Sequence, residues 1–172
     1  MKPVTIGSGL AALLLAACSS MPGGGPSATA SLKPTQGNSA TAVVNFQQMK
    51  SGVLVTTDAQ GLTPGPHGFH IHEKGDCSAP DGTSAGGHFN PTGQPHGDPV
   101  KGEHHAGDIP MLEADASGKA HLETRLEGLA IGAGTTDIVG RAVIIHAAPD
   151  DYRTQPTGNS GARVACGVIV AK

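Results

Sequence analysis

From about Thr29 onward, the chain consists of short runs in which apolar and polar residues alternate, separated by turns rich in glycine and proline. Such alternation is typical of strands with one buried face. The runs cover 41–49, 53–57, 68–72, 120–126, 138–145 and 163–170, with turns at 50–52 and 114–118. About eight short strands and no long helical period predict an all-β protein, an antiparallel sandwich or barrel. Because the chain has no Trp, three Phe and one Tyr, we expect a core of Val, Ile, Leu and Ala.

The first residues have the composition of a secretion signal. A lysine near the start is followed by an apolar run over 10–17 that ends in small residues before Cys18. This pattern predicts a signal peptide over 1–17, with a buried N-terminal helix as the alternative. Leu-Ala-Ala-Cys resembles the lipoprotein signal of bacteria, in which the cysteine is lipidated and becomes the mature N-terminus. We therefore expect export to the periplasm with a lipid on Cys18, a flexible tether over 18–30 and the folded domain over 31–172.

The cysteine count is consistent with this prediction. Three cysteines in an exported protein leave an odd thiol. If Cys18 carries a lipid, Cys77 and Cys166 remain and can form a disulfide in an oxidising compartment. A free, buried cysteine is the alternative.

The charge of the chain excludes some classes of partner. Eleven Lys and Arg against 14 Asp and Glu give a net charge of -3, which argues against a nucleic-acid-binding protein. Membrane contact is expected through the N-terminal lipid only. The unusual feature of the composition is nine histidines.

Two of these histidines lie on one predicted strand. Because side chains alternate along a strand, His70 and His72 point to one face while Phe69 and Ile71 point to the other. A His-x-His pair alone is a weak signal of a metal site. It is strengthened by residues 74–109, a long stretch dense in Gly, Pro, Asp and His. A loop this long without secondary structure is usually functional or disordered, and its four histidines and one cysteine favour a functional loop.

Four stretches resemble a known family. They are Gly68-Phe-His-Ile-His72, Gly87-His-Phe-Asn-Pro91, His105-Ala-Gly-Asp108 and Gly158-Asn-Ser-Gly-Ala-Arg-Val-Ala-Cys-Gly167. The residue types in these stretches, and the order of the stretches along the chain, resemble the copper/zinc superoxide dismutase family. The resemblance extends from about residue 29 to the C-terminus. The resemblance implies an eight-stranded antiparallel Greek-key barrel or sandwich with long metal-binding loops. It also implies one copper and one zinc ion per subunit.

The resemblance assigns ligands to both ions. Copper would be held by His70, His72, His88 and His146, and zinc by His88, His96, His105 and Asp108, so that His88 bridges the two. These donor sets suit Cu(II) and Zn(II). Asp150 corresponds to a carboxylate that links a copper histidine to a zinc histidine. His105 is favoured over its neighbour His104 by the family spacing, and His67 and His121 are expected to be surface or packing residues.

The implied reaction converts two superoxide anions and two protons into dioxygen and hydrogen peroxide. Arg163 corresponds to an arginine above the copper, where a guanidinium attracts and orients an anion. Arg153 and Lys101 are candidates for further steering charges. The alternatives are a copper or zinc carrier without turnover and a non-enzymatic interaction domain. Both are disfavoured, because the four methionines form no cluster of soft ligands and because every ligand and the arginine are present. A homodimer is possible, and the sequence does not decide the oligomeric state.

Overall fold

Eight antiparallel strands form one sheet in the computed structural model, which describes Met1 and residues 24–172. The strands are β1 (Ser27–Pro34), β2 (Thr41–Gln48), β3 (Val53–Gln60), β4 (Gly65–His72), β5 (Asp108–Ala114), β6 (Ala120–Leu126), β7 (Ala142–His146) and β8 (Arg163–Ala171). A short 3-10 helix, η1 (Thr83–Ala85), lies between β4 and β5. Among the described residues, no helix is long and apolar enough to span a membrane.

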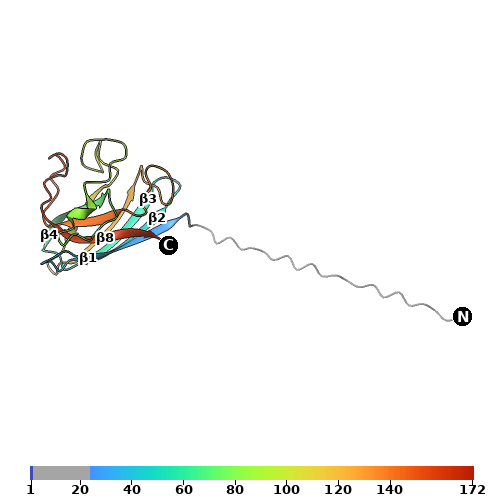
Figure 1. Ribbon diagram of the computed structural model, residues 1–172, viewed down its shortest axis with the longest axis horizontal. Helices are drawn as coiled ribbons and strands as arrows, with labels where there is room; N and C mark the ends of the chain where they lie inside the picture. Colours follow the sequence, from blue (N-terminus) through green and yellow to red (C-terminus); the bar gives the residue numbers. More distant parts are fainter. Residues whose placement is uncertain (2–23) are drawn as a thin grey trace.

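The strand order is β5-β4-β7-β8-β1-β2-β3-β6, and the two end strands contact each other, so the sheet curls into a nearly closed barrel (Figure 1). The chain forms the meander β1-β2-β3 and then crosses to β4 in the other half of the sheet. It crosses back to β6 and returns to β7, beside β4. These crossings give a Greek-key topology, and the predicted fold class is confirmed.

Alternating burial explains the strands. In β1 the buried side chains are Ala28, Ala30 and Leu32, and in β3 they are again every second residue. Inward-facing side chains from all strands fill the barrel with Val, Ile, Leu and Ala, as expected. All three phenylalanines also belong to this core, which the expectation omitted. The three phenylalanines are buried even though they are few, because burial of a large apolar ring is strongly favourable.

Several predicted boundaries were wrong. β3 continues to Gln60 rather than ending at residue 57, and β4 begins at Gly65 rather than at residue 68. β1 begins at Ser27, so residues 27–30 belong to the barrel and not to the tether. Ala28 and Ala30 are too small to give a strong hydrophobic pattern, yet both are fully buried. β7 begins at Ala142 rather than at residue 138, because Gly140 turns the chain with a φ of 78°. Residues 2–17 of the predicted signal peptide, Cys18 and the tether up to residue 23 lie outside the described residues.

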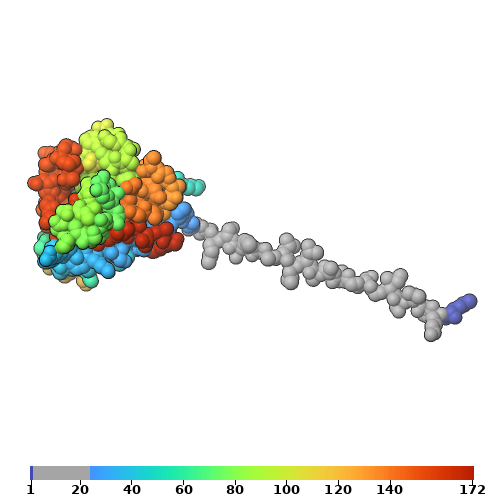
Figure 2. Space-filling model, viewed as in Figure 1, coloured from blue at the N-terminus to red at the C-terminus, as the bar shows by residue number. Residues whose placement is uncertain are grey.

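Two long loops project from the same side of the barrel and lie next to each other (Figures 1 and 2). The first, 73–107, follows β4, and the second, 147–162, follows β7. They are joined by the side chain of Gln155, whose amide donates to the carbonyl of His96 and accepts from its backbone N–H, both at 2.9 Å. The loops therefore fold as one layer over the outer wall of β4 and β7.

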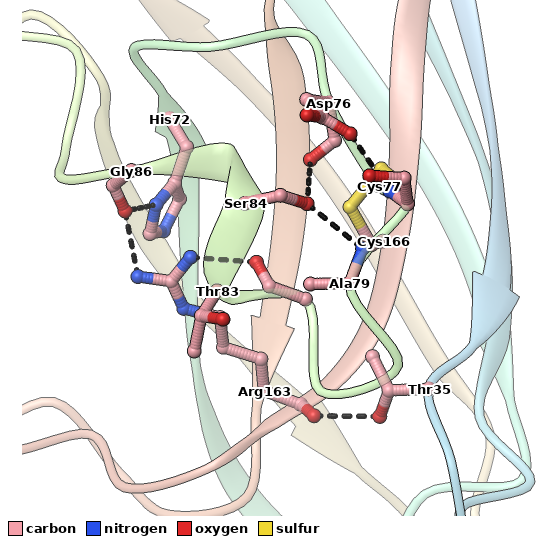
Figure 3. Close-up of a disulfide and its surroundings, with 12 residues drawn as sticks. Thr35, His72, Asp76, Cys77, Ala79, Thr83, Ser84, Gly86, Arg163 and Cys166 are labelled. Carbon is pink, nitrogen blue, oxygen red and sulfur yellow. Dashed lines mark hydrogen bonds between the residues drawn. A yellow bond between two sulfur atoms is a disulfide. The ribbon is translucent and has the colours of Figure 1, made fainter.

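A disulfide between Cys77 and Cys166 joins the first loop to β8, with 5.8 Å between the Cα atoms (Figure 3). The expected pairing is confirmed. Ser84 supports the bridge from inside the loop, where its hydroxyl donates to the carbonyl of Asp76 at 2.8 Å and accepts from the N–H of Ala79 at 3.1 Å. The loop is therefore held to the barrel covalently at a point 89 residues away in sequence.

We predict that replacing both Cys77 and Cys166 by Ser lowers the free energy of unfolding by up to about 4 kcal/mol, because the unfolded chain regains the freedom of a very long loop. Denaturant unfolding of oxidised wild type and variant, at equal metal content, measures the difference. Equal stability of the two proteins would show that the bridge adds nothing to the contacts of the loop.

Candidate metal centre

Two groups of buried metal-ligating side chains meet on the outer wall of the barrel. The four-histidine cluster contains His70, His72, His88 and His146, and the mixed cluster contains His88, His96, His105 and Asp108. Within each cluster, one ligand atom per residue lies within 4.8 Å of the others. Metal–nitrogen bonds of about 2.0–2.1 Å bring the ligands of one ion to within about 4 Å of each other, so a small inward movement would close each cluster around an ion.

Strand geometry creates most of the four-histidine cluster. His70 and His72 alternate on β4 with Phe69 and Ile71, which lie in the core, as predicted. β7 pairs with β4 and ends at His146. His88 enters from the first loop through an isolated antiparallel bridge to His72. Three adjacent backbone segments thus present their imidazoles to one point.

Asp108 organises the mixed cluster. It begins β5 and pairs with His70 on β4, which places its buried carboxylate against the four-histidine cluster. One carboxylate oxygen lies 2.9 Å from Nδ1 of His88, and the other lies 3.0 Å from Nδ1 of His96. Nδ1 of His105 is 3.6 Å away. The cluster contains His105 and not His104, whose Nδ1 donates instead to the carbonyl of His105.

The buried polar atoms without a hydrogen bond mark where cations fit. Among the described residues, seven buried side-chain polar atoms have no partner, and six are imidazole nitrogens of the two clusters. They are Nδ1 of His70, His96 and His105 and Nε2 of His72, His88 and His146. Buried polar groups in native proteins almost always have a partner, so six convergent imidazole nitrogens indicate a metal-binding site rather than random packing.

The opposite ring nitrogens have fixed acceptors. Asp150 accepts from Nε2 of His70 at 2.6 Å and from Nε2 of His96 at 2.9 Å, so one carboxylate links the two clusters. Nδ1 of His72 donates to the carbonyl of Gly86 at 2.9 Å, and Nδ1 of His146 donates to that of Gly161 at 3.2 Å. These bonds set each ring's tautomer and leave the inward nitrogen free to bind a metal.

The electrostatics also prepare the side chains as ligands. Burial lowers the pKa of His88 to about 4 and that of His146 to about 3, which keeps both rings neutral near pH 7. Burial opposes the charge of Asp108, yet the hydrogen bond from His88 and the close approach of His96 and His105 hold its pKa well below the usual range. Burial also opposes the charge of His96, yet Asp108 and Asp150 raise its pKa to about 9, so that metal binding there displaces a proton.

Arg163 lies at the start of β8, half-buried beside the four-histidine cluster. Its two terminal nitrogens donate to the carbonyls of Gly82 at 2.7 Å and Gly86 at 2.6 Å. Figure 3 shows the carbonyl of Gly86 receiving bonds from both Arg163 and His72. The disulfide-bonded loop thus fixes the guanidinium next to the cluster.

Three residues that support the site were not found from the sequence. His67, which was expected at the surface or in packing, is buried and its Nδ1 lies 2.6 Å from the carbonyl of His146. The backbone N–H of Asp150 donates to the sulfur of Met111 at 3.2 Å, and the N–H of Met111 donates to the hydroxyl of Tyr152 at 3.1 Å. Each contact uses a backbone group far away in sequence, so no spacing signals it.

The remaining polar candidates lie away from the clusters. His121 is exposed on β6 and lies 2.8 Å from a carboxylate oxygen of Asp58 on β3, as expected for a surface residue. Lys101 forms a surface ion pair with Asp98 at 3.1 Å. Arg153 is exposed on the second loop.

Comparison with known proteins gives the family. A family model described as "Copper/zinc superoxide dismutase (SODC)" matches residues 40–169. The chain belongs to the copper/zinc superoxide dismutase family. A "Superoxide dismutase [Cu-Zn]" from Caulobacter vibrioides is 42% identical over 149 residues, which cover 83% of this chain and 85% of the relative. The protein of the same name from Deinococcus radiodurans is 38% identical over 172 residues, covering 92% and 91%.

A solved structure agrees with the fold. The crystal structure of the clock protein EA4 superposes with a TM-score of 0.75 at 37% sequence identity, covering 84% of this chain and 93% of that one. The protein is therefore an oxidoreductase of the superoxide dismutase type that uses copper and zinc. The function and both cofactors expected from the sequence are confirmed.

Gly158 provides a test of how tightly the site is packed. Its φ is 67°, and a Cβ at this position would overlap the carboxylate of Asp150 and approach Nε2 of His96 to 2.6 Å. Gly158→Ala should therefore displace Asp150, lower the stability and release zinc on dialysis. Gly93→Ala is the matched control, because Gly93 has a φ of 68° and open space around its Cβ position.

The free energy of unfolding of the Gly93→Ala control should fall by only about 1–2 kcal/mol, because alanine disfavours the left-handed backbone conformation. Unfolding free energies and zinc content after dialysis compare the two variants. Equal losses would mean that Asp150 adapts to a methyl group, and the packing argument would then fail.

Proposed function

We propose that the four-histidine cluster holds copper and the mixed cluster holds zinc, with His88 shared between them. The convergence of the six unpartnered nitrogens carries this proposal. Four imidazoles suit Cu(II), whereas three imidazoles and one carboxylate suit tetrahedral Zn(II). Copper supplies the one-electron redox couple that oxidises one superoxide to dioxygen and reduces a second, with two protons, to hydrogen peroxide. Zinc is redox-silent, and its ligands order the first loop.

The residues around the copper position have separate roles. Asp150 and the carbonyls of Gly86 and Gly161 keep the rings of His70, His72 and His146 in fixed tautomers, so each turns a lone pair inward. His88 presents Nδ1 to the mixed cluster and Nε2 to the four-histidine cluster. Its Nε2 can therefore take up a proton while Nδ1 stays in place.

Arg163 is the proposed substrate-binding cation. A guanidinium stays protonated at any physiological pH and can attract superoxide and hydrogen-bond to it. Because its donors to Gly82 and Gly86 reach only neutral carbonyls, the side chain is fixed without losing its positive charge. A metal carrier has no use for a fixed cation beside its ion, which favours an enzyme over a carrier.

The two metal assignments predict separable losses. His146→Ala should abolish copper binding and activity and leave zinc bound, because His146 belongs to the four-histidine cluster alone. Asp108→Asn should release zinc first and lower the thermal stability. Metal analysis after dialysis, with a dismutation assay, measures both.

His104→Ala is the control for the register of the first loop and should keep both ions, because the His104 ring lies outside both clusters. If the His104 variant lost zinc while the Asp108 variant kept it, the assignment of zinc ligands would be wrong.

Arg163→Ala should leave copper and zinc content unchanged and lower the rate with superoxide at least several-fold. Arg163→Glu should lower it further, because the local field changes sign. The wild-type rate should fall as ionic strength rises, since salt limits the distance over which the charge acts to about 8 Å at physiological ionic strength. Pulse radiolysis across a salt series measures these rates, with Arg125→Ala as the control, since Arg125 is exposed and paired with Glu127. Unchanged rates and salt response in both Arg163 variants would contradict the role.

We also propose that the chain is exported to the periplasm and anchored there by a lipid on Cys18. The similar chains include bacterial enzymes and one named extracellular, which is compatible with export. The Cys77–Cys166 disulfide fits an oxidising compartment.

Intact-mass analysis of membrane-extracted protein should find an N-terminus at residue 18 that carries acyl chains. Cys18→Ser should release the protein from the membrane fraction. A soluble wild-type protein with an unmodified Cys18 would exclude the lipid anchor and leave export intact.

A further inference from the structure

We infer that Arg141 is a positioning residue for His88, the residue shared by the two clusters. The inference rests on the metal assignments proposed above and deepens them. Arg141 immediately precedes β7, outside both clusters. It acts through the residues that flank the cluster histidines.

The guanidinium of Arg141 stacks with its face on an aromatic ring and donates hydrogen bonds from its edge. Its central carbon lies 3.9 Å from the ring centroid of Phe89, a cation–π contact. Nη1 donates to the carbonyl of Glu73 at 2.6 Å, and Nε donates to the carbonyl of Asp137 at 3.0 Å. A planar fork with fixed donors can satisfy these three contacts at once, whereas a lysine ammonium cannot.

The partners of Arg141 are the neighbours of three cluster residues. Phe89 follows His88, Glu73 follows His72, and Arg141 lies five residues before His146 on the same segment. The Arg141 side chain therefore connects the three backbone segments that carry these histidines of the four-histidine cluster.

Backbone hydrogen bonds hold the main chain next to His88, and Arg141 adds support through the Phe89 side chain. The N–H of Phe89 donates to the carbonyl of Ile71 at 2.8 Å, and the N–H of Glu73 donates to the carbonyl of Gly87 at 2.9 Å. These bonds hold the backbone on both sides of His88. They do not fix the neighbouring Phe89 ring, which is 97% covered and has Arg141 stacked on it.

A ring that serves two clusters tolerates little rotation. Repacking of the Phe89 ring against the His88 segment would turn Nδ1 and Nε2 of His88 together, so both ions would lose a ligand direction at once. Loss of Arg141 should therefore weaken copper and zinc binding in parallel. This paired loss differs from the separate losses expected for His146→Ala and Asp108→Asn.

The test compares Arg141→Lys, Arg141→Ala and Phe89→Leu with the wild-type protein and with the surface control Arg125→Ala. Affinities for copper and zinc are measured by competition with a chelator. The electron paramagnetic resonance spectrum of bound Cu(II) is recorded with and without zinc. In a shared-ligand site, adding zinc changes the copper spectrum through His88.

Both Arg141 variants should bind each metal about tenfold more weakly, as is typical when a residue that orients a ligand is removed. Their zinc-dependent change in the Cu(II) spectrum should shrink. Phe89→Leu should show the same direction of change, and Arg125→Ala should match wild type. If Arg141→Ala does not fold, Arg141→Lys and Phe89→Leu decide the question.

Wild-type affinities and spectra in the Arg141 variants would overturn the inference, even if the melting temperature fell, because Arg141 would then be a stabilising residue only. A wild-type protein that fails to bind copper and zinc together would overturn the metal assignments and this inference with them. The two failures are therefore distinguishable.

Discussion

The burial of six imidazoles beside two carboxylates, on the outer wall of a barrel, is the constraint on which the loop structure depends. Among the described residues, six of these buried nitrogens have no protein partner, and an unsatisfied buried polar group costs roughly 1–3 kcal/mol. The loops over 73–107 and 147–162 contain little regular secondary structure that could offset this. Ions bound as proposed would therefore stabilise these loops as well as supply the chemistry. Asp150 of the second loop accepts a hydrogen bond from His96 of the first loop and another from His70 of β4, so it couples both loops to the barrel wall.

The position of Arg163, the proposed substrate-binding cation, depends on whether the two cysteines are joined in a disulfide. The segment closed by Cys77 and Cys166 also carries the carbonyls of Gly82 and Gly86 that hold Arg163. The carbonyl of Gly86 accepts from Nδ1 of His72 as well. A movement of this segment would therefore disturb a proposed copper ligand and the proposed substrate-binding cation together.

Much of this arrangement could be predicted from the sequence, because it follows from local patterns. Period-two alternation predicted the strands and also placed His70 and His72 opposite Phe69 and Ile71. Family spacing selected His105 over His104. The start of β1 was missed because Ala28 and Ala30 give little hydrophobic contrast, although close packing buries both. His67, Met111 and Arg141 were missed because they act on backbone groups or on a ring brought near by folding. Such contacts depend on the three-dimensional path of the loops, which no sequence period encodes.

The charge of the protein makes the placement of Arg163 informative. The chain has a net charge of -3, and removal of residues 1–17 would take away Lys2 and leave -4, so an evenly spread charge would repel an anionic substrate. Surface cations such as Lys101 and Arg125 are paired with carboxylates that cancel them locally. Among the described residues, Arg163 has no such ion pair and is bound by neutral carbonyl oxygens. Carbonyl dipoles hold a guanidinium in place and leave its net charge intact. An excess of negative charge elsewhere therefore does not prevent a positive field at Arg163, the proposed substrate-binding cation, and a half-buried cation in a region of low dielectric projects that field further than an exposed one.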